Sequence, residues 1–82
     1  MSNKDEIKKT LILIFYELFG NDIPTIKENT SSADIDGWDS FNNLNLIAAS
    51  EEAFKIRISA REIENLMNVG DLINLIYRKT RP

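Results

Sequence analysis

One run of the chain, residues 36–40 (DGWDS), combines carboxylates with a serine hydroxyl just where an amphipathic helix is expected to begin. A serine acts as a nucleophile only when a base, usually a histidine or a lysine held by a third group, takes its proton. The chain has no histidine, and a solvated aspartate such as Asp39 is too weak a base for a hydroxyl. We therefore expect no catalytic residue, and we interpret Ser40 as a group on which other proteins act.

A metal site is not expected either. Asp34, Asp36 and Asp39 alternate along the chain in a way that resembles a calcium-binding loop. The glycine of that loop comes too early in this chain, however, and Asn45 stands where the loop needs a bidentate glutamate. Cysteine and histidine, the usual ligands of zinc and haem, are absent from the chain.

The composition limits the class of protein. The 82 residues are 43% hydrophobic and 28% charged, which is ordinary for a small folded domain and too apolar for a disordered chain. A net charge of −3 argues against nucleic acid, whose phosphates need a basic patch. The longest apolar run, residues 11–16, is too short to cross a membrane, and the first residues do not resemble a signal peptide. We expect one domain over residues 1–82, monomeric and cytoplasmic, that binds neither membrane nor nucleic acid.

Apolar spacing predicts two long helices in the first two thirds of the chain. The first covers roughly residues 4–19, and Asn3 with Glu6 resembles a capping box at its start. Residues 20–39 lose the helical period and predict one long ordered connection, anchored on the core by Ile23, Ile26 and Ile35. The second helix starts at Asp39 or Ser40, either of which can cap it, and ends near Phe54. Its apolar face is predicted to contain Phe41, Leu44, Ile47, Ala48 and Phe54.

The last third predicts two further helices. Residues 54–58 alternate as a strand would, but a lone strand has no partner, so we expect an extended connector. Ser59 and Glu62 form a second potential capping box before a short helix that reaches about Leu66. A final helix starts near residues 68–71 and frays from Arg78. The expected fold is all-α, a four-helix bundle with three longer helices, a short third helix and a long loop between helices one and two.

The segments around and after Ser40 resemble the acyl carrier protein family. Residues 37–47 (GWDSFNNLNLI) are similar to the attachment motif of that family and lie half-way along a short acidic helical chain. The likeness continues through three later segments, namely residues 50–54 (SEEAF), 55–63 (KIRISAREI) and 66–72 (LMNVGDL). The Asp-Ser pair alone is a weak signal, whereas the whole pattern, which runs from the first helix to the fourth, is specific.

The resemblance implies a free-standing carrier without enzymatic activity of its own. Ser40 would carry 4'-phosphopantetheine, and Asp39 would help a phosphopantetheinyl transferase to recognise the site. The arm would hold acyl groups as thioesters and shuttle them between the acyl-loading and acyl-processing enzymes of a dissociated (type II) pathway such as fatty acid or polyketide biosynthesis. Trp38 is expected to pack into the long loop. The small residues Ala48, Ala49 and Ser50 suggest room between helices for the cargo.

The resemblance also implies a partner-binding face along the second helix, which in this family is often richly acidic. In this chain we assign partner binding to Phe41, Asn45, Glu51 and Glu52. Asparagines occupy positions 42, 43 and 45, where acidic residues are common in the family. This departure favours partners other than those of a standard fatty-acid carrier.

Two alternatives remain open from the sequence. A peptidyl or aminoacyl carrier of a nonribosomal pathway would use the same attachment point, because the sequence encodes the serine and not the cargo. An unmodified helical interaction module would use Asp39 and Ser40 only as a helix cap.

Overall fold

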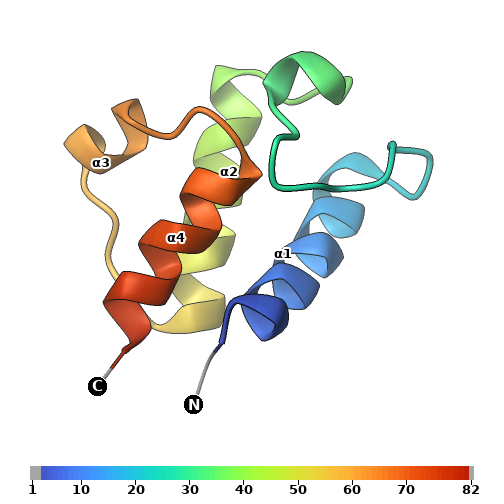
Figure 1. The fold of residues 1–82 in the computed structure, drawn as a ribbon. Helices are drawn as coiled ribbons and strands as arrows, with labels where there is room; N and C mark the ends of the chain where they lie inside the picture. Colours follow the sequence, from blue (N-terminus) through green and yellow to red (C-terminus); the bar gives the residue numbers. More distant parts are fainter. Residues whose placement is uncertain (1–2, 82) are drawn as a thin grey trace.

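The computed structural model describes residues 3–81 as four α-helices and one short 3₁₀ turn (Figure 1). The long helices are α1 (Lys4–Phe19), α2 (Ser40–Phe54) and α4 (Val69–Thr80), while α3 (Ala60–Glu64) is short and the 3₁₀ turn η1 (Ser32–Asp34) precedes α2. This confirms the predicted all-α fold with three longer helices, a short third helix and a long loop between helices one and two.

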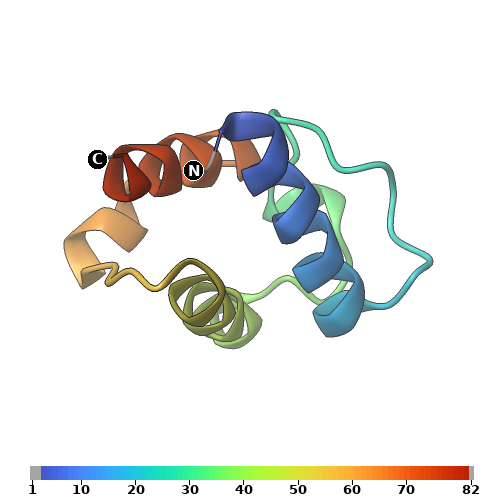
Figure 2. The same cartoon turned by 90° about the horizontal axis from the view of Figure 1, so that it is seen from below.

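The three long helices surround one core, with α1 antiparallel to both α2 and α4 (Figures 1 and 2). The start of α1 and the end of α4 lie side by side, at the opposite end of the molecule from the start of α2 (Figure 1). Contact across these ends is direct, because the Nζ of Lys4 lies 5.3 Å from the centre of the Tyr77 ring.

Local capping fixes where the helices start. The Asn3 side chain accepts a hydrogen bond from the backbone N–H of Glu6, and the Glu6 carboxylate accepts one from Asn3, so the predicted capping box is present. Ser59 and Glu62 form the second predicted box at the start of α3. The hydrogen bond from the Ser59 N–H holds the pKa of Glu62 below its usual value. Lys79, whose Nζ lies 3.0 Å from the Glu62 carboxylate, lowers this pKa further. That contribution to stability is present at neutral pH and is lost as pH falls through the lowered pKa.

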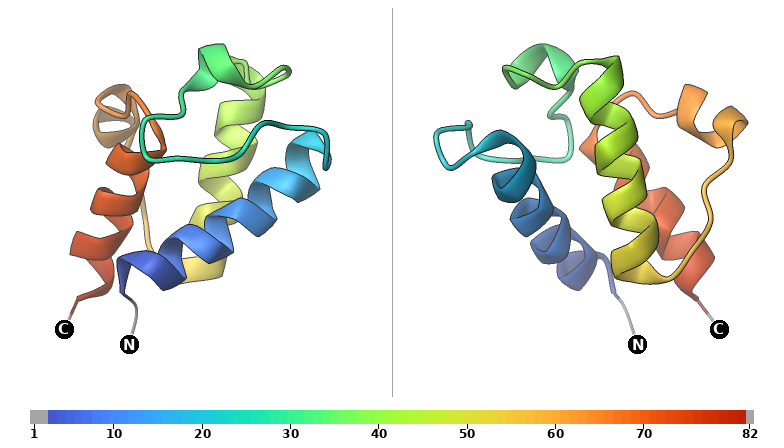
Figure 3. Two further views of the ribbon diagram at one scale, coloured as in Figure 1. Left: turned by 45° about the vertical axis from the view of Figure 1, so that its right-hand side comes forward. Right: turned by 180° about the vertical axis from the view of Figure 1, so that it is seen from behind.

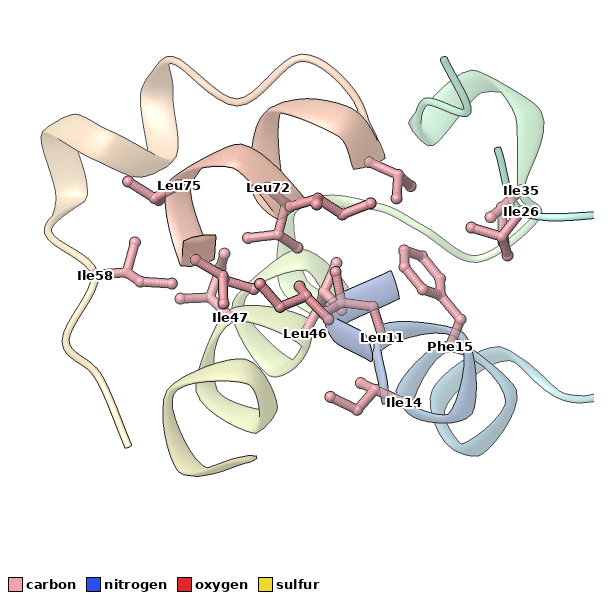
Figure 4. Packing of buried hydrophobic residues seen from close by; sticks show 14 residues of the cluster. Leu11, Ile14, Phe15, Ile26, Ile35, Leu46, Ile47, Ile58, Leu72 and Leu75 are labelled. Atoms are coloured by element: carbon pink, nitrogen blue, oxygen red, sulfur yellow. The ribbon is translucent and has the colours of Figure 1, made fainter. Parts of the chain in front are cut away.

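The core joins α1 to α2 and α4 (Figure 4). Residues Ile7, Leu11, Ile14 and Phe15 are buried on α1, as their spacing predicted. They share the core with Leu46 and Ile47 of α2 and with five apolar residues of α4, namely Val69, Leu72, Ile73, Leu75 and Ile76. Burial of such side chains gives about 1.5 to 3 kcal/mol each, which makes this cluster the main source of stability.

The predicted apolar face of α2 is wrong in most of its members. Of the five residues assigned to it only Ile47 is buried, Phe54 is half-buried, and Phe41, Leu44 and Ala48 are exposed. The residues that α2 buries are Leu46, Ile47 and Ser50. The helix carries apolar residues on two faces, and periodicity alone does not say which of the two meets α1 and α4.

Apolar anchors and backbone bonds hold the long connection between α1 and α2. Ile26 and Ile35 are buried and lie close to Phe15 (Figure 4), as predicted for anchors of an ordered crossover. The backbone N–H groups of Val69 and Gly70 donate to the carbonyls of Thr30 and Glu28 at 2.9 and 2.7 Å, which ties the connection to the start of α4. A Cβ at Gly70 would lie only 3.0 Å from the Glu28 carbonyl oxygen, so a larger residue would have to displace the connection by a few tenths of an ångström.

Glu51 organises the connection between α2 and α3. Its Oε2 accepts a hydrogen bond from the backbone N–H of Ile58 at 2.8 Å, across seven residues. Its carbonyl accepts from Lys55, which ends α2 in the left-handed conformation (φ 56°, ψ 51°), and from Ile56. The extended connector predicted here is confirmed, and Ile58 is buried.

Two predicted helix ends need correction. The third helix ends at Glu64 instead of Leu66, because the Asn65 and Leu66 N–H groups close a tight final turn on Glu62 and Ile63. The last helix continues through Arg78 to Thr80, whose hydroxyl donates to the Ile76 carbonyl. Within residues 3–81, no helix is both long and apolar enough to pass through a membrane.

Removal of the Glu51 side chain should loosen the α2–α3 connection. We expect Glu51→Ala to lower the free energy of unfolding by about 1 to 2 kcal/mol, because a partly buried N–H loses a charged acceptor. Glu51→Gln keeps an oxygen at that place and should cost less than half as much. Urea unfolding followed by circular dichroism measures both values. Equal stability of Glu51→Ala and the wild type would contradict this role.

Candidate functional site

Ser40 is the first residue of α2, and its side chain is exposed. The cap before it is Asp39, which has extended backbone and accepts a hydrogen bond at Oδ1 from the Asn42 N–H at 2.8 Å. Of the two residues that the sequence allowed as a cap, the structure uses Asp39. The Ser40 hydroxyl therefore does not act as the helix cap.

Asparagine side chains hold the turn that precedes Ser40. Gly37 takes a φ of 90°, which favours glycine, and its carbonyl accepts hydrogen bonds from the Asp39 N–H at 3.0 Å and from Asn42 Nδ2 at 2.7 Å. Asn43 Oδ1 accepts a hydrogen bond from the indole N–H of Trp38 at 2.9 Å. The Asn42 and Asn43 side chains therefore hold residues 37–38 against the start of α2. From the sequence, these asparagines indicate only that acidic residues are missing, and their function in the turn is not predicted.

Trp38 connects the turn to α1. Its ring meets Phe15 edge to face with 5.1 Å between ring centres, and Phe19 lies 6.3 Å away. Packing of Trp38 was predicted and is confirmed, but the aromatic rings that it meets belong to α1 and not to the long loop. Ser40 is therefore positioned from two sides, by the cap within the turn and by an aromatic cluster on α1.

A pocket of about 360 Å³ lies beside Ser40. Its polar walls come from the start of α2 and the preceding loop, and its apolar walls come from α2, α4, the loop and the α3–α4 connection: Trp38, Leu46, Ile47, Leu66, Met67 and Leu72. The sequence suggests room for the cargo at three other residues of α2, Ala48, Ala49 and Ser50, and that suggestion stays a hypothesis. None of these three lines this pocket, and Ser50 is fully buried with its hydroxyl bonded to the Leu46 carbonyl.

The residues assigned to partner binding lie along α2 but differ in their surroundings. Phe41, Asn45 and Glu52 are exposed, and Asn45 donates a hydrogen bond to Asn42 at 3.2 Å. Glu51 is half-buried and already binds the Ile58 N–H. Their role in partner binding stays a prediction.

Met67, exposed at the pocket beside Ser40, was missed because no local pattern marks a single methionine in a connection.

The geometry presents the serine hydroxyl without activating it. The Asp39 carboxylate, the nearest acid in sequence, is engaged by the Asn42 N–H. The residues that line the pocket include no lysine, and the chain has no histidine. Among residues 3–81, no three carboxylates come together as a metal site. This arrangement suits a hydroxyl that another protein modifies, and offers no base for ester hydrolysis.

Comparison with known proteins extends over nearly the whole chain. The acyl carrier protein of Chlamydia caviae is 36% identical over 81 residues, covering 99% of this chain and 97% of that protein. That of Chlamydia felis is 37% identical over 81 residues, covering 99% and 96%. The chain belongs to the acyl carrier protein family. No family model matches it.

Solved acyl carrier proteins share the fold. The solution structure of a holo acyl carrier protein from Geobacter metallireducens superposes with a TM-score of 0.79 at 39% identity, covering 87% of this chain and 82% of that one. A putative acyl carrier protein from Mycobacterium tuberculosis gives a TM-score of 0.78 at 26% identity, covering 88% and 96%. The resemblance found in the sequence is thus confirmed. The curated relatives are carriers by name, in keeping with a site that has a hydroxyl and no base.

In this acyl carrier protein the cap, Asp39, and the candidate attachment residue, Ser40, are separate residues, which substitutions at Asp39 can test. We expect Asp39→Ala to lower the free energy of unfolding by about 1 kcal/mol, because the Asn42 N–H loses its acceptor. Asp39→Asn retains a capping oxygen and should cost less than half of that. Urea unfolding gives both values, and Ser40→Ala, which leaves the cap in place, is the matched control. A cap at Ser40 would reverse the order of the two alanine variants.

Proposed function

We propose that this protein carries acyl groups as thioesters on a 4'-phosphopantetheine arm attached to Ser40, and moves them between the enzymes of a dissociated biosynthetic pathway. Membership of the acyl carrier protein family supports the class of function. One observation supports the attachment point: Ser40 is exposed at the start of α2 while Asp39 holds the cap. Esterification of the Ser40 hydroxyl therefore leaves the capping bond intact.

The surroundings of Ser40 fit the group. A phosphodiester at this position would lie at the positive end of the α2 dipole, which favours an anion modestly. The adjoining pocket offers both apolar and polar walls to an uncharged chain. The chain contains no cysteine, so the thiol that forms the thioester has to come from the arm.

Attachment requires a second protein. The Ser40 oxygen attacks a phosphorus of the coenzyme A diphosphate, a new O–P bond forms, and the bond to 3'-phosphoadenosine 5'-phosphate breaks. The serine proton passes to a base of the transferase, because this chain supplies none at the site. Asp39, next to the acceptor and exposed, is positioned for recognition by that enzyme. Acyl-loading and acyl-processing enzymes are the later partners, and we place this work in the cytoplasm.

Intact mass spectrometry tests the proposal. After incubation with coenzyme A and a broad-specificity phosphopantetheinyl transferase, the wild type should gain the mass of one phosphopantetheine and Ser40→Ala should gain none. Ser32→Ala is the matched control, because Ser32 is an exposed serine that lines the same pocket, and it should gain the full adduct. A wild type without the adduct would leave only the unmodified interaction module.

A further inference from the structure

The outward face of α2 is uncharged over its first two turns. Phe41 is 73% exposed and Leu44 is 59% exposed, and Asn45 and Ala48 continue this face. Exposed charges appear on this face only near the end of the helix, at Glu52 and Lys55. Figure 3 shows α2 from behind, in front of α1 and α4, so the described helices leave this face uncovered.

Folding does not require this apolar face. The core is complete on the opposite side of α2, where Leu46, Ile47 and Ser50 are buried. Phe41 and Leu44, three residues apart, are neighbours on the helix surface and expose a joint apolar area to water. Contiguous apolar area of this kind marks interaction sites more often than isolated exposed residues do.

Met67 is a third exposed apolar residue near Ser40. It is 74% exposed and lines the same pocket as Ser40. Its backbone is fixed, because its N–H donates to the Asp71 carboxylate at 2.9 Å. Ser40 therefore lies among three exposed apolar side chains, Phe41, Leu44 and Met67, which we call the apolar patch.

Resting on the proposed carrier function, we propose that enzymes acting at Ser40 dock on the apolar patch through an apolar surface of their own and do not need a cluster of basic residues facing α2. Any enzyme that brings a group to the Ser40 hydroxyl has to cover the side chains around it, which are Asp39 and the members of the patch. The first two turns of α2 contain no carboxylate that could pair with a basic surface, and the Asp39 carboxylate before them already accepts a hydrogen bond from the Asn42 N–H.

Hydrophobic docking and charge pairing respond differently to salt. From about 0.1 M to about 1 M salt the screening length falls from about 10 Å to about 3 Å, which weakens contacts between exposed charges. Burial of apolar surface does not weaken in this way. The dependence of docking on salt therefore identifies the chemistry of the partner surface.

The test uses the phosphopantetheinyl transferase as the docking enzyme, at saturating coenzyme A. We expect Phe41→Ser combined with Leu44→Ser to raise the KM for this protein at least about tenfold with little change in kcat, since each side chain loses its burial in the complex. Leu13→Ser is the matched control, because Leu13 is also a large apolar residue, 62% exposed, but lies on α1. It should leave KM unchanged, and circular dichroism checks that all variants fold.

Salt provides the second readout. The KM of the wild type should stay within about twofold across that salt range. Asn45→Asp with Ala48→Glu, which places carboxylates where the apolar surface of the enzyme would cover them, should raise the KM at low and at high salt. A wild-type KM that rises steeply with salt, or that rises in Glu52→Gln but not in the Phe41 and Leu44 variant, would overturn the proposal. Because an adduct still forms in those cases, such an outcome differs from failure of the carrier function, in which the wild type gains no adduct.

Discussion

The position of Ser40 depends on how Trp38 packs. The indole ring is held against Phe15 of the core, and its N–H is bound by Asn43 of α2, so one side chain connects the first helix, the turn and the second helix. The bonds from Asn42 to Gly37 and to Asp39 complete the lock. A connection of twenty residues would otherwise leave the start of α2 with considerable freedom. The entropy that this connection loses when it becomes ordered is offset by the burial of Ile26 and Ile35 and by two backbone hydrogen bonds to α4.

Local signals in the sequence predicted the fold well. The capping residues Asn3, Asp39 and Ser59 each accept a hydrogen bond from the residue three positions later. A hydrogen bond over so short a distance in the sequence can be predicted from the residue types alone. The bond from Glu51 to Ile58 is different, because it depends on where the chain returns after α2. For that reason the sequence assigns Glu51 only to partner binding and does not predict its structural role. A partner that bound Glu51 would have to compete with the Ile58 N–H for the same carboxylate.

The second helix shows where periodicity reaches its limit. Phe41, Leu44 and Ile47 share a helical spacing that indicates one apolar face, yet Phe41 and Leu44 lie outside the core. The choice between the two apolar faces is made by α1 and α4, through Leu11, Phe15 and Leu72, and no window within α2 contains that information. The error is informative, because packing of the core does not explain an apolar face that stays exposed to water in the folded protein.

The proximity of the two chain ends has a consequence for how this fold can be handled. Lys4 contacts the Tyr77 ring, so the beginning of α1 and the end of α4 adjoin at the end of the molecule remote from Ser40. A short linker could join these ends, and new ends could be opened in the exposed segment around residues 21–22. A circular permutant of this kind would keep α2 and its turn continuous. A label or surface tether placed at the old junction would hold the molecule with Ser40 turned outward.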